Sequence, residues 1–195
     1  MDLESGSSAP LTNRGWSHNY NCTAKWPELE VTATTREIAD YFEEHYFAHG
    51  HTYEAHPLTL AAGVASIQEY KRLNLIERAR QLGEYMGKQL QSLQKRHKAV
   101  GEVRGIGLFW ALELVRNRET RRPFNTREDK LAGKPLVVDF VASECFKNGV
   151  FVATWINNLI IAPPLIIGEG DIDRGVNALD KGLEVADRDV DPRGP

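Results

Sequence analysis

Cysteine is scarce in this chain of 195 residues, which contains only Cys22 and Cys145. The two lie far apart in the sequence, and the residues after Met1 lack the basic and apolar regions of a secretory signal. A disulfide framework needs more cysteines and an oxidising compartment. We therefore expect two reduced thiols in a cytoplasmic protein.

Long apolar runs and an excess of charge of one sign are also missing. The longest apolar run, residues 159–167, is split by Pro163 and Pro164 and is too short to span a bilayer. The 24 basic and 27 acidic residues are mixed along the chain and leave a net charge of -3. This pattern gives no basic surface for nucleic acid and no polybasic membrane anchor, so small molecules or another protein are the expected partners.

The residues that are present, 42% of them hydrophobic, suffice to bury a core. Residues 1–30 show no periodic pattern, and a strand is expected at residues 29–33. Thr34 and Glu37 have the spacing of a capping box, which predicts a helix that runs through His45.

The remaining pattern predicts helices on one side of a small mixed sheet, which is an α+β fold. Pro57 opens a long helical arm that continues to about Arg96. Gly105 and Gly107 mark a bend or a close backbone approach between two strands. The segments expected after the arm are a strand near residue 103, a strand at 108–115, an exposed connection at 117–134, a helix at 136–146, strands at 150–153 and 159–161, and a helix at 171–187.

Four of the six histidines, His45, His49, His51 and His56, fall within one short segment. Imidazole is a common ligand of transition metals, and His45 and His49 have the spacing of one helix face. Gly50 interrupts such a helix, however, and the spacing matches neither H-E-x-x-H nor a Cys/His finger. A His-rich metal-binding protein is therefore one hypothesis for this segment.

The second hypothesis comes from a longer match. Residues 47–62, FAHGHTYEAHPLTLAA, and five later motifs stand in the order in which they occur in one enzyme family. The later motifs are residues 101–110, 123–126, 133–136, 149–150 and 161–165. Over about residues 31–187 the chain resembles class III aminotransferases, which depend on pyridoxal phosphate, and taurine:pyruvate aminotransferases are the members it is most similar to.

The resemblance implies the C-terminal part of a fold-type I transferase that depends on pyridoxal phosphate, with α+β and α/β elements. Residues 1–30 form an irregular segment without a family match. Residues 31–97 correspond to the end of the large domain and the connecting helix, and residues 98–187 to a small α+β domain. Residues 188–195 are expected to be a loose tail.

Thr52 is the one residue that stands at a position where the family binds the cofactor. The corresponding threonine of the family donates its hydroxyl to the cofactor phosphate of the neighbouring subunit, whereas a threonine outside such a site commonly caps or turns the backbone. Lys25, after Ala24, is the candidate for the lysine that holds the cofactor. It lacks the glycine that follows in the family and stands too close to Arg36, so a surface lysine is the alternative. No aspartate matches the partner of the pyridine nitrogen.

The substrate implied by the resemblance is an ω-amino donor such as taurine, with pyruvate as the acceptor. Many members carry an arginine for the substrate carboxylate between the positions of Val150 and Pro163, and this chain has none there. Without an assignable lysine the chain is expected to be inactive alone. Its expected partner is a second copy or a full-length homologue, and a non-catalytic dimerisation module is the alternative function.

Overall fold

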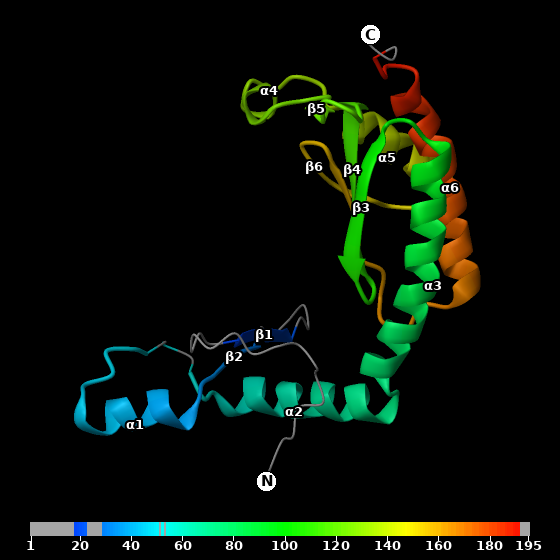
Figure 1. Ribbon diagram of the computed structural model, residues 1–195. Helices are drawn as coiled ribbons and strands as arrows, with labels where there is room; N and C mark the ends of the chain where they lie inside the picture. The colour runs from blue at the N-terminus through cyan, green and yellow to red at the C-terminus, as the bar shows by residue number, and fades with distance from the viewer. Residues whose placement is uncertain (1–17, 23–28, 51, 53, 192–195) are drawn as a thin grey trace. The chain divides into compact units, whose positions relative to one another are not determined.

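A computed structural model describes residues 18–22, 29–50, 52 and 54–191 (Figure 1). Its internal packing separates two units, Met1–Leu73 and Asn74–Pro195, and each is described by itself. In these described ranges, no helix has both the length and the apolar composition needed to cross a membrane. The domain boundaries expected from the resemblance stay a prediction.

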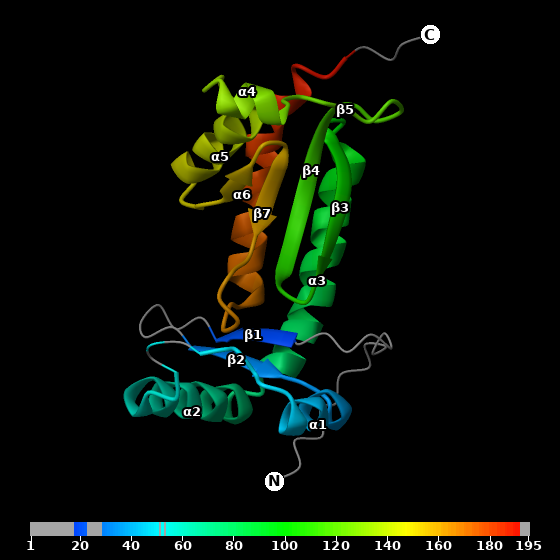
Figure 2. The same cartoon turned by 90° about the vertical axis from the view of Figure 1, so that its left-hand side faces the viewer.

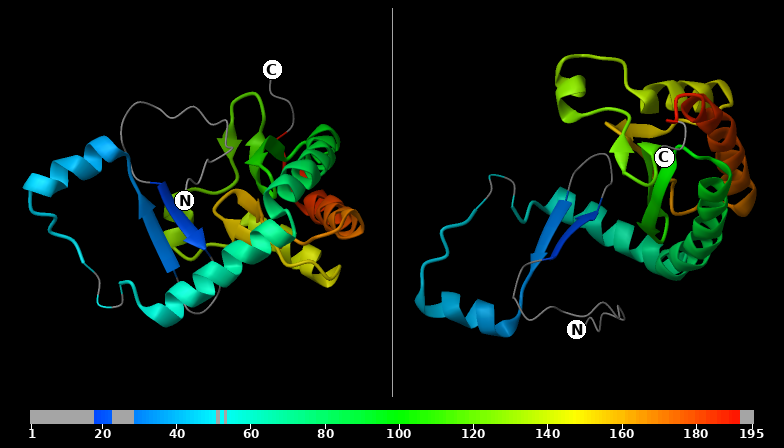
Figure 3. Two further views of the ribbon diagram at one scale, coloured as in Figure 1. Left: turned by 90° about the horizontal axis from the view of Figure 1, so that it is seen from below. Right: turned by 45° about the horizontal axis from the view of Figure 1, so that its top comes forward.

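The first unit combines a two-stranded sheet with two helices (Figure 3). Strand β1 (His18–Cys22) pairs antiparallel with β2 (Leu29–Ala33), so the strand expected at residues 29–33 is confirmed. Helices α1 (Arg36–Glu44) and α2 (Pro57–Arg72) follow. Pro57 occupies the first turn of α2, where a missing N–H costs no helical hydrogen bond.

Two sequence predictions for helix ends are wrong. Thr35 is the N-cap of α1 and makes no side-chain cap hydrogen bond, so the capping box expected at Thr34 does not form. The expected helical arm is broken: α2 ends at Arg72, and α3 (Leu75–Arg96) starts after Asn74, which has a left-handed φ of 48°. Asparagine tolerates this conformation. Because the apolar period resumes after the turn, the sequence pattern did not reveal the break.

The second unit contains a five-stranded sheet in the order β3-β4-β7-β6, with β5 paired to β4 (Figure 2). All of these described pairings are antiparallel, so the expected mixed sheet is wrong. The strand expected at residues 150–153 lies at 153–155, where it pairs in a hairpin with the next strand. The strands are β3 (Val100–Ile106), β4 (Phe109–Asn117), β5 (Arg122–Pro123), β6 (Ala153–Trp155) and β7 (Asn158–Ile161).

Helices α4 (Arg127–Leu131), α5 (Val137–Lys147) and α6 (Glu169–Asp187) complete this unit. Helix α4 lies inside the segment expected as an exposed connection. A capping box opens it: the Thr126 hydroxyl accepts from the Asp129 amide at 3.2 Å, and the Asp129 carboxylate accepts from the Thr126 amide at 2.8 Å. At the C-terminal end, the Asp191 amide donates to the Arg116 carbonyl at 2.9 Å, within the segment expected as a loose tail.

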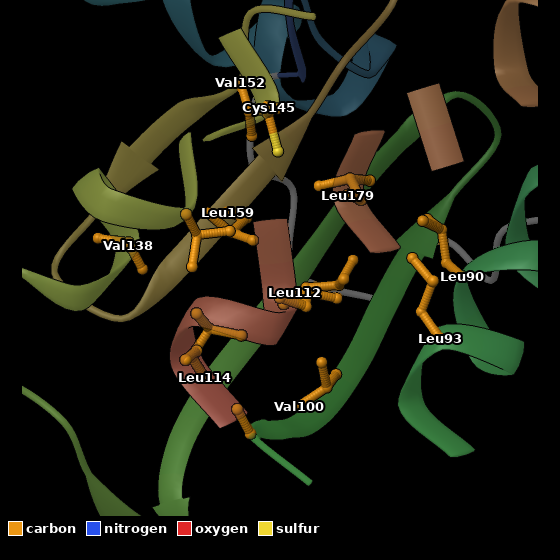
Figure 4. Packing of buried hydrophobic residues seen from close by; sticks show 14 of the residues in the cluster. Leu90, Leu93, Val100, Leu112, Leu114, Val138, Cys145, Val152, Leu159 and Leu179 are labelled. Carbon is orange, nitrogen blue, oxygen red and sulfur yellow. The ribbon is translucent and has the colours of Figure 1, made fainter. Parts of the chain in front are cut away.

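The core of the second unit lies between the sheet and the helices (Figure 4). Leu112 and Leu114 of β4 flank the half-buried Glu113, and both are fully buried in this core together with Leu90 and Leu93 of α3. Full burial of each such leucine contributes about 1.5–3 kcal/mol. Because α3 and α5 pack on an antiparallel sheet and α6 packs on these two helices, the expected α+β fold is confirmed.

Candidate functional site

Thr52 lies in the turn that connects α1 to α2 in the first unit. Residues 46–50 have no regular structure, Thr52 is exposed, and Ala55 has a left-handed φ of 53°. His56 is the N-cap residue of α2, and its carbonyl accepts from the Leu60 amide at 3.0 Å. The turn therefore places Thr52 five positions before Pro57, the first residue of a long helix whose N-terminal amides carry partial positive charge.

His45 and His49 make local contacts with aromatic residues of the same segment. The ring of His45 stacks on Tyr41 with a centroid distance of 3.9 Å, and its Nδ1 lies 2.7 Å from the Tyr41 carbonyl oxygen. His49 lies 5.3 Å from the ring of Phe47. Within the described ranges, no three side chains of His, Cys, Asp or Glu are grouped so that they could hold a metal ion. His51 and Tyr53 lie outside the described residues.

The described residues do not fit a complete site for pyridoxal phosphate. Lys25 lies outside them, and a cavity of about 570 Å³ in the second unit has no lysine among its lining residues. Lys88 lines a second hollow over α3, but it is exposed on the helix surface. A lysine that forms a Schiff base must lose its proton, which desolvation or a neighbouring cation brings about. In the part of the chain that the structure describes, Thr52 is an exposed hydroxyl in the turn before α2, and no lysine lines the 570 Å³ cavity.

The 570 Å³ cavity gave no signal in the sequence, because separate segments build its walls. It lies between α3, the residues that precede and form β6, the end of β7 and the first turns of α6. Met86, Leu90 and Leu179 are among its apolar walls, and Asp171 and Arg174 are its charged lining residues. These two side chains form an ion pair with each other, so the cavity as described suits apolar groups.

The segment between Val150 and Pro163 exposes two aromatic rings. Phe151 is 82% exposed and Trp155 is 57% exposed, and the Lys130 ammonium lies 3.5 Å from the centroid of the Trp155 ring. The amide of Asn157 serves the structure instead: its Oδ1 accepts from the Asn125 amide at 2.9 Å, and its Nδ2 donates to the Asn125 carbonyl at 2.6 Å.

Arg104, the basic residue of the 101–110 motif, is held in a network of charges on the sheet. Its guanidinium donates to Glu113 at 3.0 Å and to the Oδ1 of Asn158 at 2.9 Å. Arg121 bonds both Glu102 and Glu113, and its hydrogen bond lowers the pKa of Glu102. With its donors engaged by acidic and amide oxygens, Arg104 has a structural role here.

Comparison with known proteins agrees with this fold. A family profile described as Aminotransferase class-III matches residues 28–183. The chain is 36% identical over 162 residues to ethanolamine-phosphate phospho-lyase homolog 1 of Caenorhabditis elegans, covering 82% of this chain and 33% of that protein. It is 34% identical over 139 residues to a putrescine–pyruvate aminotransferase of Pseudomonas aeruginosa, covering 71% of this chain and 28% of that protein.

Among solved structures, the chain is similar to a taurine:2-oxoglutarate aminotransferase of Bifidobacterium kashiwanohense in complex with pyridoxal phosphate and glutamate. The TM-score is 0.72 at 31% identity, over 83% of this chain and 35% of that one. The chain thus spans about a third of the length of the relatives it matches. Membership of the family implies pyridoxal phosphate as the cofactor. From the profile match and these similarities, the chain belongs to the class-III aminotransferase family.

Proposed function

We propose that this chain contributes Thr52 to the phosphate-binding part of a pyridoxal phosphate site that is shared with a neighbouring subunit. The observation that carries the proposal is the position of Thr52, exposed in the turn before α2 and inside the matching 47–62 motif. A hydroxyl near a helix N-terminus is well placed to receive a phosphate group. The cofactor supplies the electron sink for amino transfer when it is bound in the complete site.

The proposed reaction is transfer of an amino group from an ω-amino donor such as taurine to pyruvate. Pyruvate appears in the name of the Pseudomonas relative and taurine in the name of the Bifidobacterium enzyme. The absence of an arginine between Val150 and Pro163, together with the engagement of Arg104 by Glu113, favours a donor other than an ordinary α-amino acid.

By itself the chain is proposed to be inactive, because the described residues offer no enclosed lysine. The purified chain is mixed with pyridoxal phosphate, taurine and pyruvate, and the expected result is neither a Schiff-base absorbance band nor alanine. Alanine formation at a rate above that of free cofactor would overturn the proposed inactivity. Because one relative is named a phospho-lyase, phosphate release from O-phosphoethanolamine is measured in parallel. Release of phosphate without alanine contradicts the aminotransferase assignment.

The proposed partner is a second copy of the chain or a full-length homologue that supplies the lysine. We expect a mixture with a full-length class-III aminotransferase to give a mixed species in light scattering. In that species, Thr52→Val weakens cofactor binding by roughly tenfold or more, because a hydrogen bond to a charged group is lost. Thr52→Ser keeps the hydroxyl and serves as the matched control. Equal cofactor affinity of the Val and Ser variants would show that the Thr52 hydroxyl does not bind the cofactor.

A non-catalytic association module is the second candidate, and the surface of α2 favours it. Gly63 is the one buried residue of α2, whereas Leu58, Leu60, Val64 and Ile67 of the same helix are 43–69% exposed. An apolar patch of this kind is typical of a surface that meets another protein. Light scattering of the chain alone, and mixed with a full-length homologue, tests it. A clean monomer in both measurements excludes association.

A further inference from the structure

The inward face of α6 is tightly packed at one glycine and open at another. Gly175 follows the buried Ile172 by three positions and precedes the buried Leu179 by four, so it lies on the side of α6 that packs inward. Gly182 lies seven positions further, about two helical turns, on the same side. A Cβ atom at Gly182 would stand 2.8 Å from the Cys145 Sγ of α5, whereas a Cβ atom at Gly175 would meet nothing within 4 Å.

This open space exists because α5 ends before it reaches the first turns of α6. The Cys145 Sγ donates to the Ala178 carbonyl at 3.4 Å, and α5 ends soon afterwards, at Lys147. Helix α6 begins at Glu169, more than two turns before Ala178, and Figure 2 shows it continuing past α5. The cavity of about 570 Å³ lies there, and α5 contributes no residue to its lining.

The polar side chains among the lining residues are exposed at the rim and already have partners. They are Asn148, Asp171 and Arg174. Asp171 and Arg174 form an ion pair with each other. The Asn148 amide donates to the Glu144 carbonyl at 2.9 Å and accepts from the Lys181 ammonium at 2.9 Å. An ionised ligand would therefore have to bury its charge in the cavity without a matching partner, which is costly.

The inner walls of the cavity are apolar and belong to the core. Helix α3 supplies two buried wall residues and α6 supplies three, and these are Met86, Leu90, Ile172, Val176 and Leu179. Because an apolar cavity of about 150 Å³ takes up one benzene ring, a volume of about 570 Å³ has room for about three such rings. The size and the walls fit a small-molecule site.

We propose that this cavity binds an uncharged apolar small molecule, of the class of aromatic or aliphatic compounds without an ionised group. Such a ligand displaces water from the apolar walls and gains dispersion contacts with them. Phe151 lines the cavity and is 82% exposed, so its ring stands at the mouth and contacts the bound molecule. The site lies entirely in the second unit and does not depend on the proposed aminotransferase reaction.

Met86 reports directly on whether the cavity is occupied. The chain contains two methionines, Met1 and Met86, so carbon labelling of the methionine methyl groups gives two NMR signals. Toluene is expected to shift the Met86 signal until it saturates. Benzoate keeps the ring but adds a charge, and it is expected to bind at least about tenfold more weakly. No saturable shift with toluene, or equal binding of toluene and benzoate, overturns the proposal, and both measurements use the unaltered chain.

Gly175→Leu is expected to fill the cavity from its α6 wall and to abolish the shift of Met86 by toluene. The matched control is Gly170→Leu on the same helix, where a Cβ also meets nothing within 4 Å but the residue does not line the cavity. This control should keep the affinity of the unaltered chain. Unchanged affinity in Gly175→Leu, or equal loss in both variants, would show that toluene binds elsewhere.

Phe151→Ala tests the mouth without filling the cavity. Its affinity for toluene is expected to fall by roughly two- to tenfold, the range that one aromatic contact provides. Phe146→Ala is the control, because Phe146 is also an exposed ring but does not line the cavity. Equal affinities of these two variants would contradict the placement of the ligand in this cavity.

Discussion

The indole ring of Trp110 on β4 lies against the backbone of Gly87 on α3. A Cβ atom at Gly87 would stand 2.6 Å from two carbons of that ring. The ring cannot move aside easily, because its Nε1 donates to the Gly107 carbonyl at 2.7 Å. Close packing between this helix and the β3–β4 hairpin therefore requires a glycine at position 87.

Gly87→Ala is expected to destabilise the chain by about 1–3 kcal/mol, the usual cost of extra volume in a packed contact. The matched control is Gly175→Ala on α6, where a Cβ meets nothing within 4 Å. That change should raise stability by about 0.5–1 kcal/mol, because alanine restricts the unfolded chain and favours helix. Urea unfolding of both variants checks the pair, and destabilisation by neither would contradict the packing described.

Cys145 is predicted to react slowly with thiol reagents while the chain is folded. It is fully buried, and burial raises the pKa of its thiol to about 11. A thiol with a raised pKa in the folded state stabilises the fold below its unfolded pKa, and this contribution disappears as the pH rises toward the folded value. Stability should therefore decline between about pH 9 and pH 11 more in the unaltered chain than in Cys145→Ala. A Cys22→Ser background isolates Cys145 in labelling experiments, and rapid labelling at pH 8 would contradict its burial.

Thr126→Ala is expected to unwind α4 at a cost of about 1 kcal/mol, because the hydroxyl caps the Asp129 amide. Thr126→Ser preserves the cap and is the control.

The pKa of Asp129 is lowered mainly by the hydrogen bond that its carboxylate accepts from Lys134. A lowered carboxylate pKa stabilises the fold above its unfolded value, so α4 should fray as the pH falls below about 4. Amide chemical shifts of residues 127–131 report both effects, and identical shifts in the Ala and Ser variants would show that the cap is unimportant.

Asn157→Ala is expected to cost about 1–3 kcal/mol, because it leaves the part-buried amide and carbonyl of Asn125 without their partners. Asn158→Ala removes an amide on the exposed side of the sheet and should cost less. Limited proteolysis of the connection at residues 117–136 gives a local measurement. Faster cleavage in the Asn157 variant alone is expected, and equal cleavage in both variants would refute the role of the Asn125–Asn157 contact.

Residue type and hydrophobic period predicted much of the secondary structure. The strand at residues 29–33 and the start of α2 at Pro57 follow from residue type and period, and so does the apolar face of α6. The capping box was expected at Thr34, although the one that forms stands at Thr126, with an aspartate in the third helical position. In both places a threonine precedes an acidic residue by three positions, and only the backbone around them decided which one caps.

The family resemblance rested on the order of short motifs, which a sequence carries without help from the fold. It also identified Thr52, whose role as a hydrogen-bond donor to the cofactor phosphate stays a proposal. The other candidate, Lys25, lies outside the described residues. The break at Asn74 could not be seen, because the apolar period is the same on both sides of it. Strand β6 moved from its expected place because its ladder with β7, not its composition, fixes where it begins.

The sequence by itself determined which residue types occur and at what spacing, and these decide helices, strands and motif order through local sterics and hydrogen bonding. Only the tertiary structure decided which distant groups meet. His97 reaches Asp180 and Asp187 across more than eighty positions of sequence, and the cavity walls come from α3, α6 and the β6–β7 region. Such contacts depend on how the helices pack on the sheet, and no local sequence pattern predicts this packing.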